Sequence, residues 1–454
     1  MPEWTDRQRA AIESRGQDLL VSAAAGSGKT AVMVERVKQL ILRDRVPLSS
    51  ILVMTFTNAA AAEMRMRIIE TLESAQEQAG DADGFLREQL HTIDEAWICT
   101  LHSFCSRLLR RYYPVAGVDP GFRLLDEDEA AILEIAAMDD ALSAAYESMP
   151  PGFDLLADAF GGRDGLALAT QVSRLYRFAM SRAEGLGWLD GALGALRADE
   201  DALRDSAWIA ELLRDAGEKA ADAGACFEAA LRMCEARGGP KGYRDTFAHD
   251  IEGAHRLIDA SQEGYAAFDT ALDAHAFVRL KSRGKDDDRD LADAIKDIRD
   301  TGKGIISKLK DTWQNMSLPL AAESIARMEP ALSALTALTR DFAARYAAEK
   351  SARSALDFSD LEQYALRVVD DESAAGELRG QFEAVFIDEY QDINPVQERL
   401  ITAVSRPGRL FCVGDVKQSI YRFRQAEPAL FERRYRQSSP EELSPRRRID
   451  MNCN

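Results

Sequence analysis

The stretch Val21-Ser22-Ala23-Ala24-Ala25-Gly26-Ser27-Gly28-Lys29-Thr30 follows a short apolar run, residues 19–21, and precedes a segment whose apolar residues have helical spacing. A strand, a glycine-rich turn, Lys-Thr and a helix together make up a phosphate-binding loop. Gly26 and Gly28 let the backbone curl so that successive N–H groups point at phosphate oxygens. The strict pattern has glycine where this chain has Ala23. The stretch nevertheless predicts a nucleotide-binding protein.

The side chains of this loop predict how the nucleotide and its metal ion are held. Lys29 can reach the β- and γ-phosphates, and the Thr30 hydroxyl can bind Mg²⁺. The helix that begins here adds the positive end of its dipole. The residues expected to surround the phosphates are Ala23, Ala24, Ala25, Gly26, Ser27, Gly28, Lys29 and Thr30.

The composition limits the class of protein. The 454 residues are 46% apolar, which is ordinary for a globular protein of about two to four domains. No apolar run approaches the ~20 residues of a membrane span, and the N-terminus lacks the pattern of a signal peptide. Six dispersed cysteines without a Cys-x-x-Cys pair argue against a zinc or iron–sulfur site and indicate a reducing compartment. We therefore expect a cytoplasmic protein with no membrane partner.

The net charge of −19 argues against a nucleic-acid partner when it is taken alone. Charge is local, however, and a DNA groove needs only a few basic and aromatic residues in suitable places. The acidic composition therefore does not exclude DNA.

Residues 1–125 alternate strand and helix patterns. Residues 50–54 and 96–99 are predicted strands, and a helix pattern follows each. Such alternation predicts a parallel sheet that is covered on both faces. Strand patterns return at residues 384–387 and 409–413, as the uninterrupted apolar runs expected of central parallel strands.

Residues 126–356 differ in composition from both flanking segments. They are rich in Ala, Leu, Asp, Glu and Arg, and windows such as 129–135 have helical spacing. We therefore predict an α/β fold with a parallel sheet, formed by residues 1–125 and 357–454. A large all-helical domain, residues 126–356, is inserted into it.

Two acidic residues, Asp388 and Glu389, directly follow the strand predicted at 384–387. A carboxylate at the carboxyl end of a parallel strand can reach the Mg²⁺ of a bound nucleotide, so Asp388 is the candidate metal ligand. Glu389 is the candidate base that orients or deprotonates the attacking water. The alternative is a pair of solvated acids in a loop, and the preceding buried strand speaks against it.

The next strand pattern leads into Val413-Gly414-Asp415-Val416-Lys417-Gln418-Ser419-Ile420-Tyr421-Arg422-Phe423-Arg424. Gln418 can sense a γ-phosphate from the end of the strand. Tyr421 and Phe423 offer rings on which bases of single-stranded DNA can stack. By themselves, aromatics at alternate positions are more often core residues than stacking residues.

In their order along the chain, these motifs resemble those of superfamily 1 DNA helicases of the UvrD/Rep/RecB type. The resemblance implies a RecA-like domain and ATP as the nucleotide, and it makes Gln8 of Trp4-Thr5-Asp6-Arg7-Gln8 the adenine contact. It also implies contacts to single-stranded DNA by Phe56, Thr57, Asn58 and His102. Without it, His102 would be read as a residue at the start of a helix.

A closer resemblance is to the AddA (or RexA) helicase–nuclease subunits of bacterial AddAB complexes. The segments that carry it are 23–30, 100–105, 119–123, 356–361 and 414–424. It implies an ATP- and Mg²⁺-dependent 3′–5′ helicase, with AddB as partner, that acts on single- and double-stranded DNA at double-strand breaks for homologous recombination. Residues 357–361, which could also be a helix N-cap, would re-enter the motor domain after the insertion.

The chain departs from this family in length. AddA subunits continue into a second RecA-like domain and a nuclease domain, and residues 448–454 resemble the start of motif IV. We therefore expect the sequence to be an N-terminal portion of a longer protein that alone does not unwind DNA. A stand-alone repair helicase of UvrD type and a non-catalytic nucleotide- or DNA-binding module are the alternatives.

Overall fold

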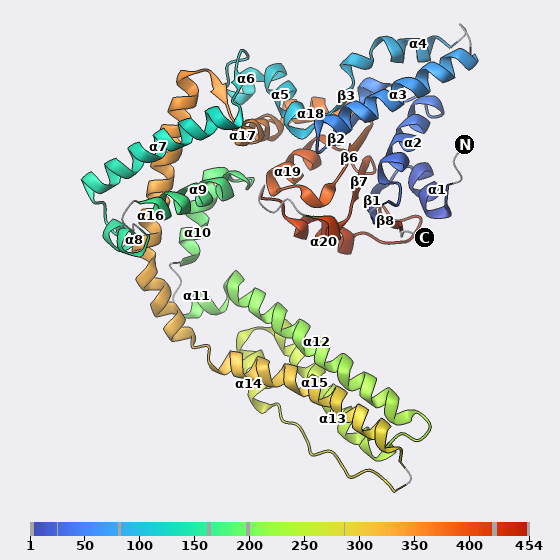
Figure 1. Ribbon diagram of the computed structural model, residues 1–454, viewed down its shortest axis with the longest axis vertical. Helices are drawn as coiled ribbons and strands as arrows, with labels where there is room; N and C mark the ends of the chain where they lie inside the picture. The colour runs from blue at the N-terminus through green and yellow to red at the C-terminus, as the bar shows by residue number, and fades with distance from the viewer. Residues whose placement is uncertain are drawn as a thin grey trace. The chain divides into compact units, whose positions relative to one another are not determined.

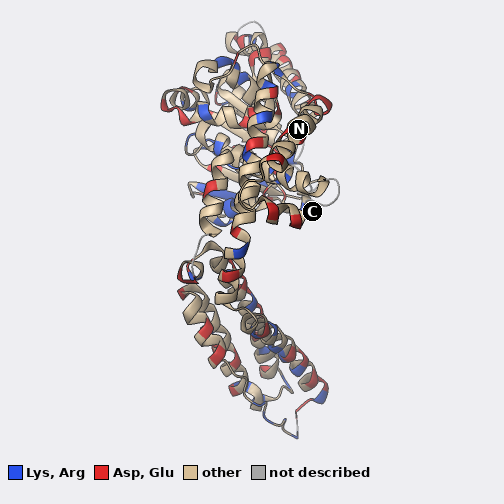
Figure 2. Ribbon diagram, turned by 90° about the vertical axis from the view of Figure 1, so that its left-hand side faces the viewer, with Lys and Arg blue, Asp and Glu red and all other residues tan. Residues whose placement is uncertain are grey.

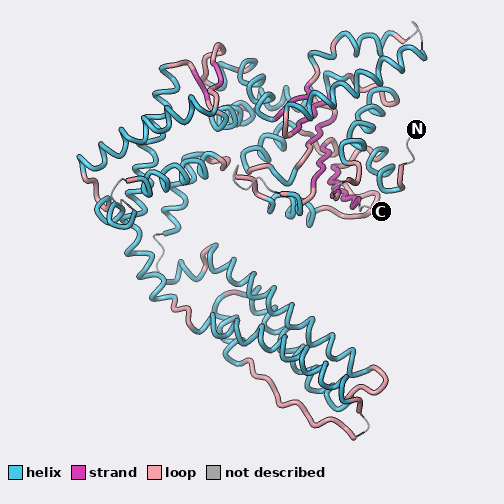
Figure 3. The backbone as a smooth tube through the Cα atoms, viewed as in Figure 1, coloured by secondary structure: helices cyan, strands magenta, loops and turns pink. Residues whose placement is uncertain are grey.

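The chain divides into two compact units, one of Met1–Leu189 with Ala334–Asn454 and one of Asp190–Ser333. The computed structural model describes residues 4–24, 26–79, 83–160, 165–196, 200–285, 287–419 and 425–451. Among these residues, all strands belong to the first unit (Figure 3).

The first unit is built on a six-stranded sheet in the order β3-β2-β6-β7-β1-β8 (Figure 1). Every neighbouring pair is parallel. The strands are β1 Asp18–Ala23, β2 Ile51–Thr55, β3 Trp97–Thr100, β6 Ala384–Ile387, β7 Leu410–Gly414 and β8 Arg446–Met451. The predicted α/β fold with a parallel sheet is therefore confirmed. Because β6, β7 and β8 lie beside β1 and β2, neither end of the chain can form this sheet alone.

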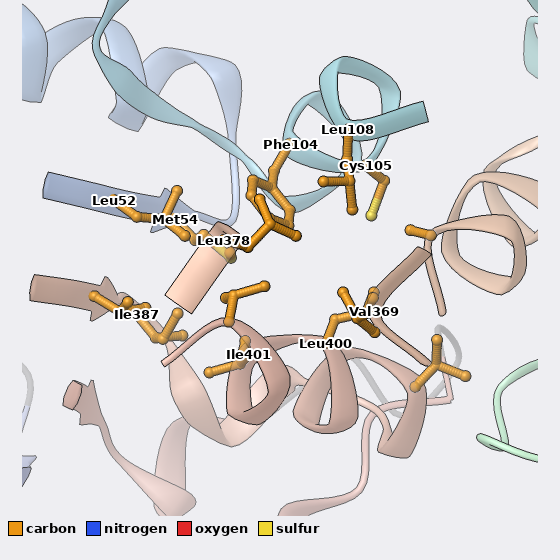
Figure 4. Packing of buried hydrophobic residues seen from close by; sticks show 14 of the residues in the cluster. Leu52, Met54, Phe104, Cys105, Leu108, Val369, Leu378, Ile387, Leu400 and Ile401 are labelled. Atoms are coloured by element: carbon orange, nitrogen blue, oxygen red, sulfur yellow. The ribbon is translucent and has the colours of Figure 1, made fainter. Parts of the chain in front are cut away.

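Both faces of the sheet are buried, and successive residues of each strand face opposite sides. In β2, for example, Leu52 and Met54 belong to one apolar core and Ile51 and Val53 to the other. The second core contains α1 Asp6–Glu13, α2 Lys29–Leu42, α3 Asn58–Ala79 and α4 Gly84–His91. The first core contains α5 Leu101–Arg111, α6 Tyr113–Ala116, α17 Phe358–Asp370, α18 Glu372–Gln381, α19 Pro395–Val404 and α20 Pro428–Gln437 (Figure 4).

Strand β8 was not predicted from the sequence. Its residues Arg446–Met451 pair in parallel with Asp18–Ala23 of β1 at the edge of the sheet. Only Ile449 and Met451 are buried. An edge strand with three consecutive arginines lacks the apolar pattern of a central strand, so β1 provides the pairing that fixes it.

The helical segment leaves and rejoins the first unit at one place. There, β4 Arg123–Leu124 pairs in parallel with β5 Ala355–Leu356. The N–H of Leu125 also donates to the carbonyl of Leu356 at 2.9 Å. The ends of the predicted insertion therefore lie side by side.

The predicted insertion is shared between the two units. In the first unit it contributes α7 Glu127–Ser148, α8 Phe153–Phe160, α9 Leu166–Met180 and the second half of α16 Leu318–Ala352. Helix α10 Trp188–Leu196 crosses the boundary between the units near residue 190. Tyr176 packs edge-on against Phe342, with ring centroids 5.2 Å apart, and so joins α9 to α16. The boundaries of the inserted domain at 126 and 356 stay a prediction.

The second unit is a helical bundle. Its helices include α11 Glu200–Arg204, α12 Ala207–Glu235, α13 Arg244–Glu263, α14 Tyr265–Ala274 and α15 Arg289–Gln314. A Cβ at Gly302 of α15 would lie 2.6 Å from the Phe227 ring, so glycine permits the close packing of α15 on α12. Asp250 and Arg299 form a buried ion pair at 2.7 Å between α13 and α15. Figure 2 shows acidic and basic positions interspersed along these helices.

No helix in the described ranges is long and apolar enough to cross a membrane.

Candidate nucleotide and DNA sites

The phosphate-binding loop connects β1, which ends at Ala23, to α2, which begins at Lys29. Gly26 and Gly28 have φ angles of 75° and 84°, in the left-handed region that favours glycine. The N–H of Ser27 donates to the carbonyl of Ala24 at 3.2 Å, which closes the turn. Ala25 lies outside the described residues. The loop therefore has a curled backbone at the N-terminus of a 14-residue helix, the geometry that an anion needs.

Gln8 lies against this loop. Its side-chain oxygen accepts from the N–H of Thr5 at 3.0 Å in the capping box of α1, which fixes its amide group. Its Nε2 then donates to the carbonyl of Ser27 at 3.0 Å, and a Cβ at Gly28 would lie 3.3 Å from the same nitrogen. Gln8 is thus held beside the phosphate loop, and its role in binding the adenine stays a prediction.

Lys29 brings the ends of three strands together. Its Nζ lies 3.2 Å from Oε2 of Glu389, after β6, and 3.3 Å from Oε1 of Gln418, after β7. The Lys29 side chain is 12% exposed and that of Glu389 is 35% exposed. Three predicted site residues from distant segments therefore meet at one point.

Two further residues close this arrangement into a ring, and the sequence analysis gave neither of them a role. Nε2 of Gln391 donates to Oε2 of Glu389 at 2.8 Å, and its Oε1 accepts from the N–H of Asp415 at 2.9 Å. The Asp415 carboxylate in turn accepts from Nε2 of Gln418 at 2.5 Å. We call these five residues, Lys29, Glu389, Gln391, Asp415 and Gln418, the Lys29 ring. Both missed residues lie inside motifs that the sequence makes visible, but only the fold shows what they contact.

The backbone around the ring is shaped to fit it. Glu389 has a φ of 51°, a left-handed conformation that is uncommon for a residue with a side chain. Gly414, at the end of β7, leaves the space that Gln391 occupies, because a Cβ there would overlap the Gln391 side chain. Gln391 itself is 1% exposed. The position of Glu389 is therefore determined by buried packing on one side and by Lys29 on the other.

Asp388 directly follows β6 and is suited to a metal ion. Burial, and secondarily the Glu389 carboxylate, raises the pKa of Asp388 to about 6. Asp388 has no ion pair within the part of the chain that the structure describes. A buried carboxylate without a cation is stabilised in its charged form by a divalent ion. Asp388, together with Thr30 at the start of α2, is therefore a suitable donor set for Mg²⁺.

The predicted DNA contacts Phe56, Thr57, Asn58 and His102 line two neighbouring cavities at the carboxyl ends of β2 and β3. The cavities have volumes of about 360 and 720 Å³, and both are lined by Phe56, Thr100, His102 and Phe358. Thr57 and Asn58 line the larger one, and Asp388 lines the smaller one. We call these two cavities the groove. Its lining includes Asp388 after β6 and the exposed Arg107 and Arg110 of α5.

Thr57 and His102 each have a defined place in the groove. Thr57 accepts from the N–H of Ala60 at 3.1 Å and so holds the first turn of α3, which begins at Asn58. His102 is in the first turn of α5, as the sequence indicated, and its Nε2 also lies 3.1 Å from Oε1 of Glu362. Tyr421 and Phe423 fall outside the described residues, so the stacking and core alternatives for them both stay predictions.

Phe358 is a groove residue that the sequence analysis missed. The N-cap interpretation of the segment is correct, because Asp357 caps α17 in a capping box with Asp360. The side chain that follows, Phe358, is nevertheless 41% exposed and packs on His102 with ring centroids 4.6 Å apart. A phenylalanine directly after the N-cap aspartate, at the first position of the helix, was the available signal.

Comparison with known proteins agrees with this geometry. Residues 4–439 match the model of the UvrD/REP helicase N-terminal domain. The chain belongs to this family. The sheet order and the loops after β1, β6 and β7 are therefore those of a UvrD/REP-type, RecA-like domain.

The curated relatives of this UvrD/REP-family chain include proteins that are named as one subunit of an ATP-dependent helicase/nuclease. The one from Desulforudis audaxviator is 41% identical over an alignment of 475 positions that covers 99% of this chain and 38% of that protein. Those from Alkaliphilus oremlandii and Syntrophomonas wolfei are 39% and 35% identical, over 99% and 100% of this chain and 38% and 37% of theirs. The predicted resemblance to helicase–nuclease subunits is thus confirmed, and the chain spans little more than a third of their length.

Proposed function

We propose that residues 1–125 and 357–454 form the first RecA-like domain, 1A, of an ATP-driven DNA motor, and that residues 126–356 form its inserted domain, 1B. The Lys29 ring is the observation that carries this proposal. It joins the phosphate loop after β1 to the acidic loop after β6 and the glutamine after β7. A glycine-rich turn without catalytic function would have no need of these partners.

The residues around the loop divide the tasks of binding and hydrolysing ATP. Gln8 contacts the adenine, the backbone of residues 23–30 holds the phosphates, and Thr30 with Asp388 holds Mg²⁺. The metal ion, when bound, neutralises charge that develops on the β- and γ-phosphate oxygens. Lys29 adds a positive charge to the same oxygens.

The ring gives Glu389 and Gln418 their roles. Lys29 is paired with Glu389. An arriving γ-phosphate competes for the Lys29 ammonium, and Glu389 is then released to orient or deprotonate the attacking water. Gln418 contacts Lys29 from the loop after β7. A change at the γ-phosphate that moves Lys29 therefore also moves Gln418, which precedes residues 421 and 423 in the chain. Gln418 therefore couples the phosphate to movement of the DNA contacts.

The groove is the proposed path of single-stranded DNA. Phe56 and His102 line it, Thr57 and Asn58 present polar groups at its edge, and Tyr421 and Phe423 are the predicted additional stacking residues. Arg110 on α5 also lines it and is exposed. The acidic composition of the whole chain is compatible with DNA binding, because the groove itself has basic and aromatic side chains.

For the whole protein, we propose an ATP-dependent 3′–5′ DNA helicase and nuclease of the AddA type that processes double-strand-break ends for homologous recombination. It would act on single- and double-stranded DNA together with an AddB-type partner. It would work in the cytoplasm, because the cysteines that the structure describes are free thiols and a reducing compartment keeps them so. Support comes from the relatives named as helicase/nuclease subunits, which align over nearly all of this chain. These names favour a component of such a complex over a stand-alone repair helicase.

The test is ATP hydrolysis by the full-length protein with and without single-stranded DNA, followed by unwinding of a duplex that has a 3′ single-stranded tail. We expect DNA to stimulate hydrolysis and the 3′-tailed duplex to be unwound in preference to a 5′-tailed one. Hydrolysis that DNA does not affect would contradict a motor and favour a nucleotide-binding module without translocation.

A further inference from the structure

Glu362 is a buried carboxylate that no proposed role accounts for. It lies on α17, and its side chain is 7% exposed. Its Oε1 accepts from Nε2 of Gln397 at 2.7 Å and lies 3.1 Å from Nε2 of His102, and its Oε2 accepts from Nδ2 of Asn394 at 3.2 Å. Three side chains from two other elements, α5 and the start of α19, thus converge on one carboxylate.

The capping box of α19 explains why this position needs a carboxylate. Oδ1 of Asn394 accepts from the N–H of Gln397 at 2.9 Å, and Oε1 of Gln397 accepts from the N–H of Asn394 at 3.3 Å. Both amide oxygens are therefore occupied, and both NH₂ groups point toward Glu362. Only a group without donors can face two amide NH₂ groups and a histidine nitrogen at once. A glutamine at position 362 would place an NH₂ group against one of these donors.

Glu362 itself lines the smaller cavity of the groove, as do Asn394 and Gln397, and it connects His102 to the loop after β6. On one side, His102 lines the groove and packs on Phe358. On the other side, Asn394 ends the seven-residue segment that begins with Asp388 and Glu389. That segment is tightly held, because Asp392 is 5% exposed and accepts from both Ser419 and Gln391. Asn394 is therefore joined through this segment to Gln391 and Glu389 of the Lys29 ring.

We propose that Glu362 is a positioning residue that fixes His102 in the groove and ties it to the N-terminus of α19, so that DNA in the groove acts on the nucleotide site through this carboxylate. The inference rests on the proposed function. When DNA moves His102, the contact between His102 and Glu362 changes. The other described partners of Glu362 are Asn394 and Gln397, the two residues of the capping box of α19. The link is reciprocal, because a coupling between two binding sites acts equally in both directions.

The test compares Glu362→Gln with Glu377→Gln in the full-length protein. Glu377, on the neighbouring α18, is a matched control because it makes the same charge-neutralising change at an exposed carboxylate that accepts from the Tyr112 hydroxyl. ATP turnover is measured without DNA and over a range of oligo-dT concentrations, and thermal unfolding is measured alongside. For Glu362→Gln we expect turnover without DNA to be retained and the stimulation by DNA to fall by about fivefold or more. Glu377→Gln should match the wild type.

A second variant keeps the inference testable if Glu362→Gln does not fold. Gln397→Met removes one donor to Glu362 and leaves Asn394 to cap α19, so it should lower DNA stimulation in the same direction without introducing a donor clash. His102→Ala completes the set. If Glu362 affects DNA binding only by positioning His102, the double variant Glu362→Gln/His102→Ala should bind oligo-dT as tightly as His102→Ala alone.

The outcomes separate the inference from the function on which it rests. If DNA does not stimulate ATP turnover of the wild-type protein, the proposed function is contradicted. A stimulated wild type together with full stimulation of both Glu362→Gln and Gln397→Met overturns the inference and leaves the function intact. Parallel losses of basal and stimulated turnover with a lower melting temperature would show that Glu362 is only structural, and would overturn the inference as well.

Discussion

Replacing Glu389 by glutamine should separate nucleotide binding from catalysis. Oε2 of Glu389 accepts from Lys29 and Gln391, and the side chain is about one-third exposed. A glutamine can put its amide oxygen in the same place and turn its NH₂ group toward the exposed side. The ring therefore keeps its hydrogen bonds and loses only the ionic part of the Lys29 contact, which at this exposure is worth about 1 kcal/mol or less.

The effect on chemistry should be much larger. Without the Glu389 carboxylate, the attacking water has lost the base that orients it and accepts its proton. Removal of such a base lowers the rate by roughly 10²–10⁴. This corresponds to about 2.7–5.4 kcal/mol of activation free energy. We expect the nucleotide Kd to stay within a few-fold of the wild-type value or to fall, because Lys29 no longer has a competing carboxylate.

The assay is steady-state ATP turnover of the full-length protein with DNA, together with a direct measurement of nucleotide affinity. Glu383→Gln is the matched control, since Glu383 is 38% exposed and pairs with Arg406 and Arg409 outside the site. If affinity and turnover of Glu389→Gln fell together, Glu389 would be a ligand of the nucleotide or its metal ion, and its assignment as the base would be wrong.

Three other predictions test the phosphate-binding loop, the helical bundle and Asp360, a buried carboxylate in the first turn of α17. Lys29→Ala should abolish tight Mg·ATP binding or hydrolysis in the full-length protein and leave the circular-dichroism spectrum unchanged; unaltered ATPase would contradict its assignment. Asp250→Ala leaves Arg299 buried without its partner, so urea unfolding should show a loss of about 3–5 kcal/mol, whereas the exposed control Asp245→Ala should lose about 1 kcal/mol or less; equal losses would refute the argument. Burial and a neighbouring carboxylate raise the pKa of Asp360 to about 6, so the folded protein binds more protons there than the unfolded chain between about pH 4 and 6. Its free energy of unfolding should therefore fall by about 1–3 kcal/mol relative to Asp360→Asn as the pH rises through that range, and parallel pH profiles from urea titrations would rule this out.

The sequence alone was sufficient for the central strands and the phosphate loop, because their signals are local. Residues 19–21, 384–387 and 410–413 are apolar without interruption because both faces of the sheet are covered. Gly26 and Gly28 were recognisable because only glycine readily adopts the backbone that the turn requires. Glu389 and Gln418 could be placed because they directly follow such strands.

Tertiary structure decided the features that depend on partners far along the chain. Strand β8 forms because β1 offers an edge of unpaired backbone groups, and its arginines would not suggest a strand by themselves. The division of the helical segment near residues 190 and 334 follows from how its helices pack, which their spacing does not show. Gln391 and Glu362 look like ordinary polar residues in the sequence. Their importance comes from burial among donors supplied by distant segments, because a buried polar group must find its partners wherever the fold places them.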